Sequence, residues 1–122
     1  MAAVIVAKSA VYEVKPSASV TLSITIGDGQ AGGSVVRFKG AKIGPGPAIQ
    51  SLRIPQAGDA DQDLKDKTVS CTTTVERINS ASSHSSVTYS LRGGGQDSDF
   101  TFDATLPEMG QLAEYRTTII FE

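Results

Sequence analysis

The chain has 122 residues, of which 39% are hydrophobic and 20% are charged, and its formal net charge is −2 at pH 7. This balance is typical of one folded domain, because a disordered chain has fewer apolar residues and a larger net charge. A single cysteine excludes an intrachain disulfide, and together with a single histidine it excludes the usual zinc ligand sets. The mildly negative charge argues against a protein that coats nucleic acid.

The first eight residues, Met1 to Lys8, carry no positive charge ahead of their apolar stretch, which is too short for the hydrophobic part of a secretion signal. No run of eighteen apolar residues occurs, so no membrane-spanning segment is predicted. The unpaired Cys71 fits a reducing compartment. We therefore expect a cytoplasmic protein, with export by a route that needs no signal peptide left open.

Alternation of apolar and polar residues is the main pattern along the chain. Within residues 19–26, Val20, Leu22 and Ile24 share one face and the intervening polar residues share the other, which predicts a strand with one buried face. Many of the eleven threonines lie in such alternations, and β-branched residues favour strands. The same pattern predicts eight strands, over residues 4–14, 19–26, 34–39, 49–54, 68–78, 86–92, 99–106 and 114–121.

The segments between these strands are rich in turn-forming residues. Residues 61–66 and 109–113 are candidates for single helical turns, but no segment keeps a helical period over ten residues. Many short strands without crossover helices pack as two sheets or close into a barrel. We expect an all-β fold, an antiparallel β-sandwich of about eight strands, immunoglobulin-like or jelly-roll-like, forming one domain over residues 1–122.

A glycine-rich segment, Gly27 to Gly32, matches the dinucleotide-binding pattern G-x-G-x-x-G and follows a predicted strand. That pattern requires a following helix, whose N-terminal amides hold the pyrophosphate. Here residues 34–39 show a strand pattern, and no acidic residue stands about twenty positions further on. We expect a hairpin loop and no nucleotide cofactor.

Alternating carboxylates at Asp59, Asp61 and Asp63 are the most suggestive metal-binding pattern, because calcium prefers oxygen ligands. An EF-hand is excluded, because Leu64 and Ser70 stand where that motif requires glycine and glutamate. Another type of calcium loop could use these three aspartates, with further ligands from Asp66 or from the loop that holds Asp97 and Asp99. The alternative is a solvated acidic loop without metal.

Residues with catalytic chemistry are few. His84 lies in a serine-rich connection with no nucleophile motif G-x-S-x-G, and Cys71 shares the buried face of its strand, so we expect neither to be catalytic. Asp99 and Asp103 would stand ~13 Å apart on one strand face, beyond the carboxylate spacing of inverting glycosidases. We therefore expect no catalytic residues and no enzyme activity.

Two further ligand classes are disfavoured. Sugar binding relies on exposed aromatic rings, and the periodicity turns two of the three tyrosines inward, which leaves Tyr12 as the candidate. Nucleic-acid binding requires a basic face, and the nearest cluster is formed by Arg37, Phe38, Lys39 and Lys42 in a chain of negative net charge. We expect no nucleic-acid partner and no membrane partner.

Charge and hydrophobicity are unevenly distributed along the chain. Residues 1–56 carry six cationic and two acidic side chains, for a net +4, whereas residues 57–122 carry five and eleven, for a net −6. The two halves either interleave and neutralise each other or form a polar binding face. Both terminal strands are apolar on both faces, so that Ile5 and Ile120 are candidates for burial in a partner subunit.

By elimination, the sequence indicates a non-enzymatic interaction module, engaged in protein–protein interaction or assembly and favouring a homo-oligomer. The candidate binding surface consists of the loops that follow Ile26, Lys39, Ile54 and Leu91, since loops on a sheet scaffold carry most binding chemistry. The alternative is a calcium-dependent ligand-binding domain that uses the aspartates of residues 59–63. No other cofactor is expected.

Overall fold

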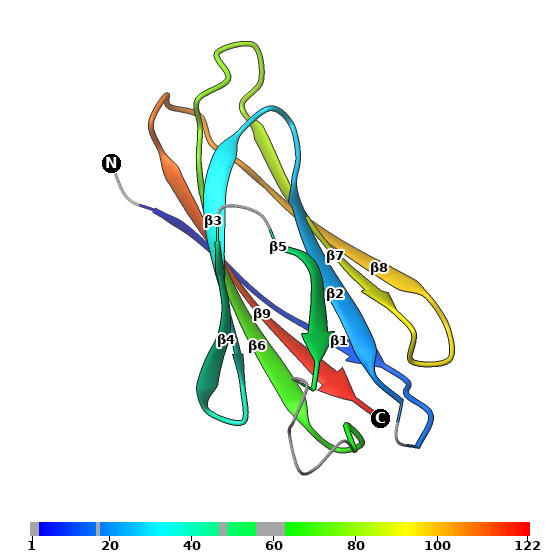
Figure 1. Cartoon of the computed structure of the whole chain (residues 1–122). Coiled ribbons are helices and arrows are strands. Elements are labelled where there is room, and N and C mark those ends of the chain that lie inside the picture. The colour runs from blue at the N-terminus through cyan, green and yellow to red at the C-terminus, as the bar shows by residue number, and fades with distance from the viewer. Residues whose placement is uncertain (1–2, 17, 47–48, 56–62) are drawn as a thin grey trace.

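A computed structural model describes residues 3–16, 18–46, 49–55 and 63–122, with the backbone alone described for residues 44–46 and 49–51. This part of the chain forms nine strands and no helix (Figure 1). Their bounds are β1 (Val4–Tyr12), β2 (Val20–Ile26), β3 (Ala31–Phe38), β4 (Ala41–Gly46), β5 (Ile49–Ile54), β6 (Thr68–Glu76), β7 (His84–Arg92), β8 (Ser98–Thr105) and β9 (Leu112–Phe121).

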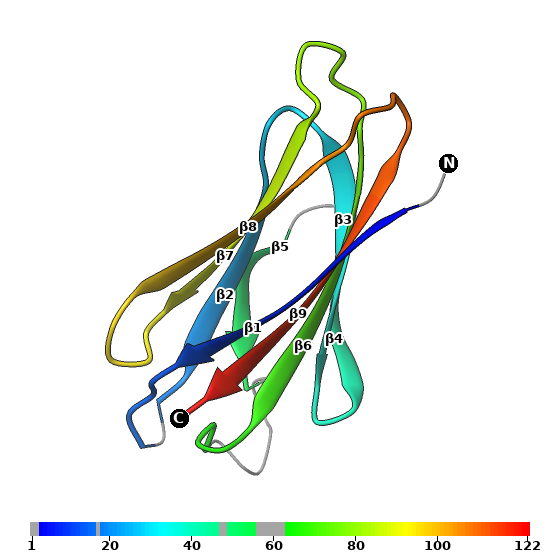
Figure 2. The same cartoon turned by 180° about the vertical axis from the view of Figure 1, so that it is seen from behind.

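The strands form two sheets and no closed barrel. Sheet A has five strands in the order β1-β9-β6-β3-β4, and sheet B has four in the order β5-β2-β7-β8. The two sheets lie face to face, and β1 runs along the margin of sheet A (Figures 1 and 2). The expected all-β, two-sheet arrangement is therefore confirmed.

The expectation of purely antiparallel pairing is wrong at one pair. β1 runs parallel to β9 over nine residue pairs, from Val4 opposite Ala113 to Tyr12 opposite Phe121. Every other pairing between the described strands is antiparallel. Because β1 and β9 come from opposite ends of the sequence, no tight turn fixes their relative direction, and local patterns do not report it.

The ninth strand, β4, lies in a segment expected to be a loop. Its glycines and Pro45 are typical loop residues, but β4 is an edge strand, where proline is tolerated because one side of the strand has no ladder to complete. Lys39 and Gly40 join it to β3 with positive φ angles of 54° and 75°, the geometry of a two-residue hairpin turn. The expected helical turns are wrong for the described residues 63–66 and 109–113, which contain no helix.

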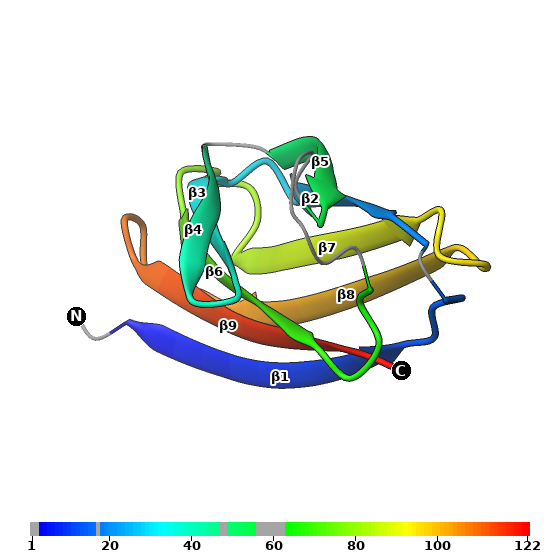
Figure 3. The ribbon, with the colours of Figure 1, turned by 60° about the horizontal axis from the view of Figure 1, so that its bottom comes forward.

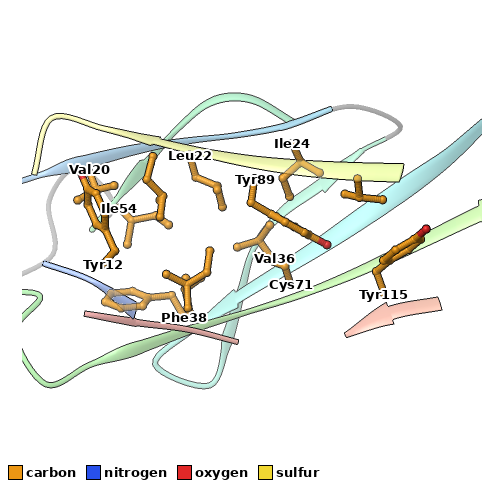
Figure 4. Packing of buried hydrophobic residues seen from close by; sticks show 14 of the residues in the cluster. Tyr12, Val20, Leu22, Ile24, Val36, Phe38, Ile54, Cys71, Tyr89 and Tyr115 are labelled. Atoms are coloured by element: carbon orange, nitrogen blue, oxygen red, sulfur yellow. The ribbon is translucent and has the colours of Figure 1, made fainter. Parts of the chain in front are cut away.

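A hydrophobic core fills the space between the sheets. Figure 4 shows side chains from both sheets pointing into this space, among them Leu22 and Tyr89 from sheet B and Val36 and Cys71 from sheet A. The alternation expected within β6 is confirmed, because Val69, Cys71, Thr73 and Val75 are buried while the residues between them are exposed. Burial of such alternating residues is the main source of stability for this arrangement.

Hydroxyl groups inside the core bind one another. The Thr73 hydroxyl lies 2.9 Å from the hydroxyls of both Ser34 and Tyr89, and the Ser85 hydroxyl lies 2.5 Å from that of Tyr115. Burial raises the pKa of Tyr89 to about 12. These pairs satisfy polar atoms that would otherwise be costly to bury, and they link the two sheets through the core.

Candidate binding surfaces

The acidic segment is described only from Asp63 onward, so Asp59 and Asp61 lie outside the described residues. Asp63 is exposed; its carboxylate accepts a hydrogen bond from the backbone N–H of Lys65 at 3.1 Å, and its carbonyl accepts one from the Lys67 ammonium. The described part of the chain brings together no group of three potential metal ligands. The calcium hypothesis stays a prediction, which a thermal melt with calcium and with chelator tests.

His84 begins β7 and is half-exposed. Its Nε2 atom lies 3.7 Å from a carboxylate oxygen of Asp103 on the neighbouring strand β8, and Asp103 is also largely exposed. An acid–imidazole pair orients a catalytic base only when a nucleophile is placed on the other side of the ring. At 3.7 Å between two exposed side chains, the His84–Asp103 pair is a loose surface contact.

Asp99 and Asp103 of β8, considered above as a catalytic pair, contact separate partners on β7. Asp99 is exposed and lies 2.9 Å from the Arg92 guanidinium, and hydrogen bonds from Ser90 and Arg92 lower its pKa. Asp103 contacts His84 instead. The lowered pKa of Asp99 is the opposite of the raised pKa that a general acid requires.

Cys71 is buried in β6 with 1% of its surface exposed, as its strand pattern predicts. Burial raises the pKa of its thiol from 9.0 to about 12. Because the thiolate is the reactive form, this cysteine is expected to be a poor nucleophile in the folded chain.

Tyr12 was expected to be the exposed aromatic residue, and this expectation is wrong. The side chain is fully buried, packs against Phe121 with the ring centroids 6.3 Å apart, and donates a hydrogen bond to the carbonyl of Gln96. The backbone N–H of Gly94 in turn donates to the Tyr12 hydroxyl at 3.1 Å. A side chain at Gly94 would collide with the tyrosine ring, so the glycine-rich loop after β7 is shaped to cover Tyr12.

The glycines of residues 27–32 have a structural role in the connection between β2 and β3. β3 begins at Ala31, within the motif, so the segment leads into a strand where a nucleotide site needs a helix. The connection is not the expected hairpin, because β2 lies in sheet B and β3 in sheet A. Gly32 is required by close approach, since a Cβ atom there would lie 2.1 Å from the carbonyl oxygen of Thr74 on β6.

The basic cluster expected at Arg37, Phe38, Lys39 and Lys42 separates into two parts. Phe38 is buried in the core, whereas the three cationic side chains are exposed. Arg37 and Lys39 line a surface hollow of about 480 Å³, together with Asp66, Lys67, Thr68 and Ser70. Local sequence patterns do not predict that Lys67 joins this cluster, because it comes beside β3 only through the long-range pairing of β6 with β3.

The open edge of sheet A is formed by β1. In Figure 3, β9 lies on one side of β1 and no described strand lies on the other. Ile5 and Val11 on its outer face are 49% and 48% exposed. Ile120 is half-buried opposite Val11, whereas Ile5 stands opposite Glu114, so the two isoleucines considered above share a face but lie about 20 Å apart along the strand.

Comparison of the chain with protein-family models, with curated proteins and with solved structures found no match. No helix in the described part of the chain is long and apolar enough to cross a membrane. The surfaces themselves are therefore the basis for a functional proposal.

Proposed function

We propose that this chain is a non-enzymatic assembly module in which two copies pair along the open edges of their β1 strands. The observation that carries the proposal is the combination of a nine-residue edge strand with exposed Ile5 and Val11 on its outer face. An open, long and apolar edge presents unpaired backbone groups and is a template for a further strand. Pairing of two copies would complete both edges at once.

The outer face of β1 is self-complementary. It carries Ile5, Ala7, Ser9 and Val11, a large, small, small, large sequence of side chains. In an antiparallel pair related by a twofold axis, Ile5 of one copy would stand beside Val11 of the other, and Ala7 beside Ser9. A twofold interface requires this kind of pattern, because each residue meets its own counterpart in reverse order.

Lys8 lies at the centre of β1, between Ala7 and Ser9 but on the opposite face of the strand, and is the one charged residue of β1. The register that pairs all nine residues places the two Lys8 ammonium groups opposite each other, which disfavours pairing. A lysine on an edge strand is a common means of limiting uncontrolled association. The proposed dimer is accordingly weak and reversible.

The assignment as non-enzymatic rests on the state of the two most reactive side chains. The thiol of Cys71 is buried, and the imidazole of His84 is half-exposed and contacts only the exposed Asp103 carboxylate loosely, at 3.7 Å. We further propose an immunoglobulin-like or jelly-roll-like sandwich, supported by the core shared between the sheets and by the changes of sheet between β2 and β3 and between β8 and β9. A cytoplasmic location stays a prediction.

Light scattering after size-exclusion chromatography over a wide concentration range tests the assembly. We expect the mass to rise from monomer toward dimer with concentration, and Val11→Lys to hold the chain as a monomer while leaving its melting curve unchanged. Thr101→Lys is the matched control, because Thr101 is exposed on β8, the edge strand of the other sheet. A strict monomer at the highest concentration, or a dimer lost in Thr101→Lys and kept in Val11→Lys, would contradict the proposal.

A further inference from the structure

We infer that the hollow at the β3–β4 side of sheet A is a binding site for a compact phosphate-bearing anion. It lies away from the β1 edge, because β9 and β6 separate β1 from β3 in the sheet order. The hollow is lined by Arg37, Lys39 and Lys67, by the hydroxyl-bearing residues Thr68 and Ser70, and by Asp66. The inference is independent of the proposed assembly.

Separate elements of the fold hold the cationic groups in place. Arg37 lies on β3 next to Ser70 of β6, and Lys39 occupies the tight turn into β4. Two hydrogen bonds hold the backbone of Lys67. Its N–H donates to the carbonyl of Leu64 at 3.0 Å, and its carbonyl accepts from the N–H of Phe121 at 2.9 Å. Such anchoring fixes the backbone positions from which the three cationic side chains project, which reduces the part of the entropic cost of binding that comes from ordering the backbone.

The lining supplies the donors that a phosphate group requires. A guanidinium offers paired N–H donors that match two phosphate oxygens, and lysine ammonium groups add point charges. The Thr68 and Ser70 hydroxyls lie on the same strand two residues apart and can donate to further oxygens. Among the described lining residues, the Asp66 carboxylate offsets one of the three positive charges.

Repulsion between neighbouring cationic side chains favours the binding of an anion in this region. Arg37 and Lys42 are direct cross-strand neighbours in the β3–β4 pair, where like charges are destabilising. Within the described residues, no hydrogen bond or ion pair engages the Arg37 guanidinium. A bound anion would relieve this repulsion, in a protein whose overall charge is −2.

The surroundings favour a compact anion over a nucleic-acid strand. Phe38, the aromatic residue of this region, is buried and offers no stacking surface. From Ser70 the outer face continues across sheet A to Thr118 and Ser9, which carry hydroxyls and no positive charge. A nucleic acid would need the basic surface to extend along this path.

Titration of inorganic pyrophosphate into the ¹⁵N-labelled chain at low ionic strength tests the site by NMR. We expect saturable shifts confined to the amides of residues 37–42 and 66–70. Arg37→Gln should weaken binding about tenfold, the size expected for losing a charged hydrogen bond. Arg116→Gln is the matched control, because Arg116 lies on the same outer face but pairs with Glu114 at 2.6 Å.

The possible results of the titration distinguish a compact anion site from nonspecific binding and from a nucleic-acid surface. Localised shifts that Arg37→Gln weakens and Arg116→Gln leaves unchanged support the site, and Lys67→Gln serves as the second variant if Arg37→Gln misfolds. Absent shifts, or shifts spread over cationic residues elsewhere such as Lys8 and Arg116, would overturn it. Tighter binding of a single-stranded oligonucleotide, weakened equally by Arg37→Gln and Arg116→Gln, would overturn the compact site in favour of an extended nucleic-acid surface.

Discussion

Ile119 and Ile120 are consecutive residues of β9, yet they face different environments. Ile119 points into the core and has no exposed surface, whereas Ile120 lies on the outer face of sheet A, opposite Val11 of β1. Packing restricts the inner face mainly to apolar and hydroxyl-bearing residues. The outer face is not restricted by core packing. It carries an apolar edge at β1 on one side of sheet A and a cationic hollow beside β3 on the other.

The largest expected effect comes from truncation on the inner face. Ile119→Ala should lower the free energy of unfolding by about 2–5 kcal/mol, because it leaves a cavity in a packed core. Ile120→Ala removes the same atoms from a half-exposed position and should cost under about 1 kcal/mol. Urea denaturation of both variants measures the difference, and equal losses would show that the two faces are not distinguished by burial.

Alkaline pH should weaken the inner face through Cys71. In the unfolded chain the thiol ionises near its ordinary pKa of 9.0, whereas in the folded chain burial raises the pKa to about 12. The unfolded state therefore binds fewer protons above pH 9, and the free energy of unfolding should fall by ~1.4 kcal/mol per pH unit in the interval between the two values. Below pH 9 this effect is absent.

Denaturation at a series of pH values checks this slope, with Cys71→Ala as the comparison. The variant should show a shallower fall above pH 9, leaving the smaller contribution of Tyr89, whose pKa is raised from 10.0 to about 12. An identical pH profile in the variant would mean that the thiol is not protected by folding.

A smaller effect is expected from the buried hydroxyls. Tyr89→Phe removes the hydrogen bond to Thr73 and should lower the free energy of unfolding by about 1 kcal/mol, since Thr73 keeps its bond to Ser34. Thermal or chemical denaturation measures the change. A variant as stable as the parent chain would show that the hydroxyl pair contributes no net stability.

The smallest effect concerns the β1 edge at Lys8. Lys8→Val should strengthen dimer formation by ~0.2–1 kcal/mol, because it removes the like-charge contact at the centre of the proposed β1 pair. Sedimentation equilibrium measures the dimer constant. Weaker association in Lys8→Val would contradict the proposed register.

The sequence predicts the inner face well, because burial imposes a period of two that local patterns report directly. The inward positions of β2, β6 and β7 agree with the expectation. The prediction for Tyr12 is wrong for a specific reason. Its alternation with Ala10 places it inward, but it lies at the end of its strand, and the sequence does not show that the glycine-rich loop after β7 covers it.

Features that depend on long-range pairing could not be predicted. The parallel β1–β9 pair joins the two ends of the chain, and the hollow brings Arg37 next to Lys67, thirty positions later in the sequence. β4 was missed because its glycines and Pro45 are permitted by its edge position, which no local pattern shows. Strand periodicity reports which way a side chain faces but not which strand lies beside it.

The most direct test of the β1 pairing is a charge exchange at Lys8. Lys8→Glu should self-associate as weakly as the parent chain, because two like charges would again face each other. An equimolar mixture of the two should form a mixed dimer more tightly than either forms alone, as measured by sedimentation with one partner labelled. A mixture that associates no better than its separate components would contradict the account.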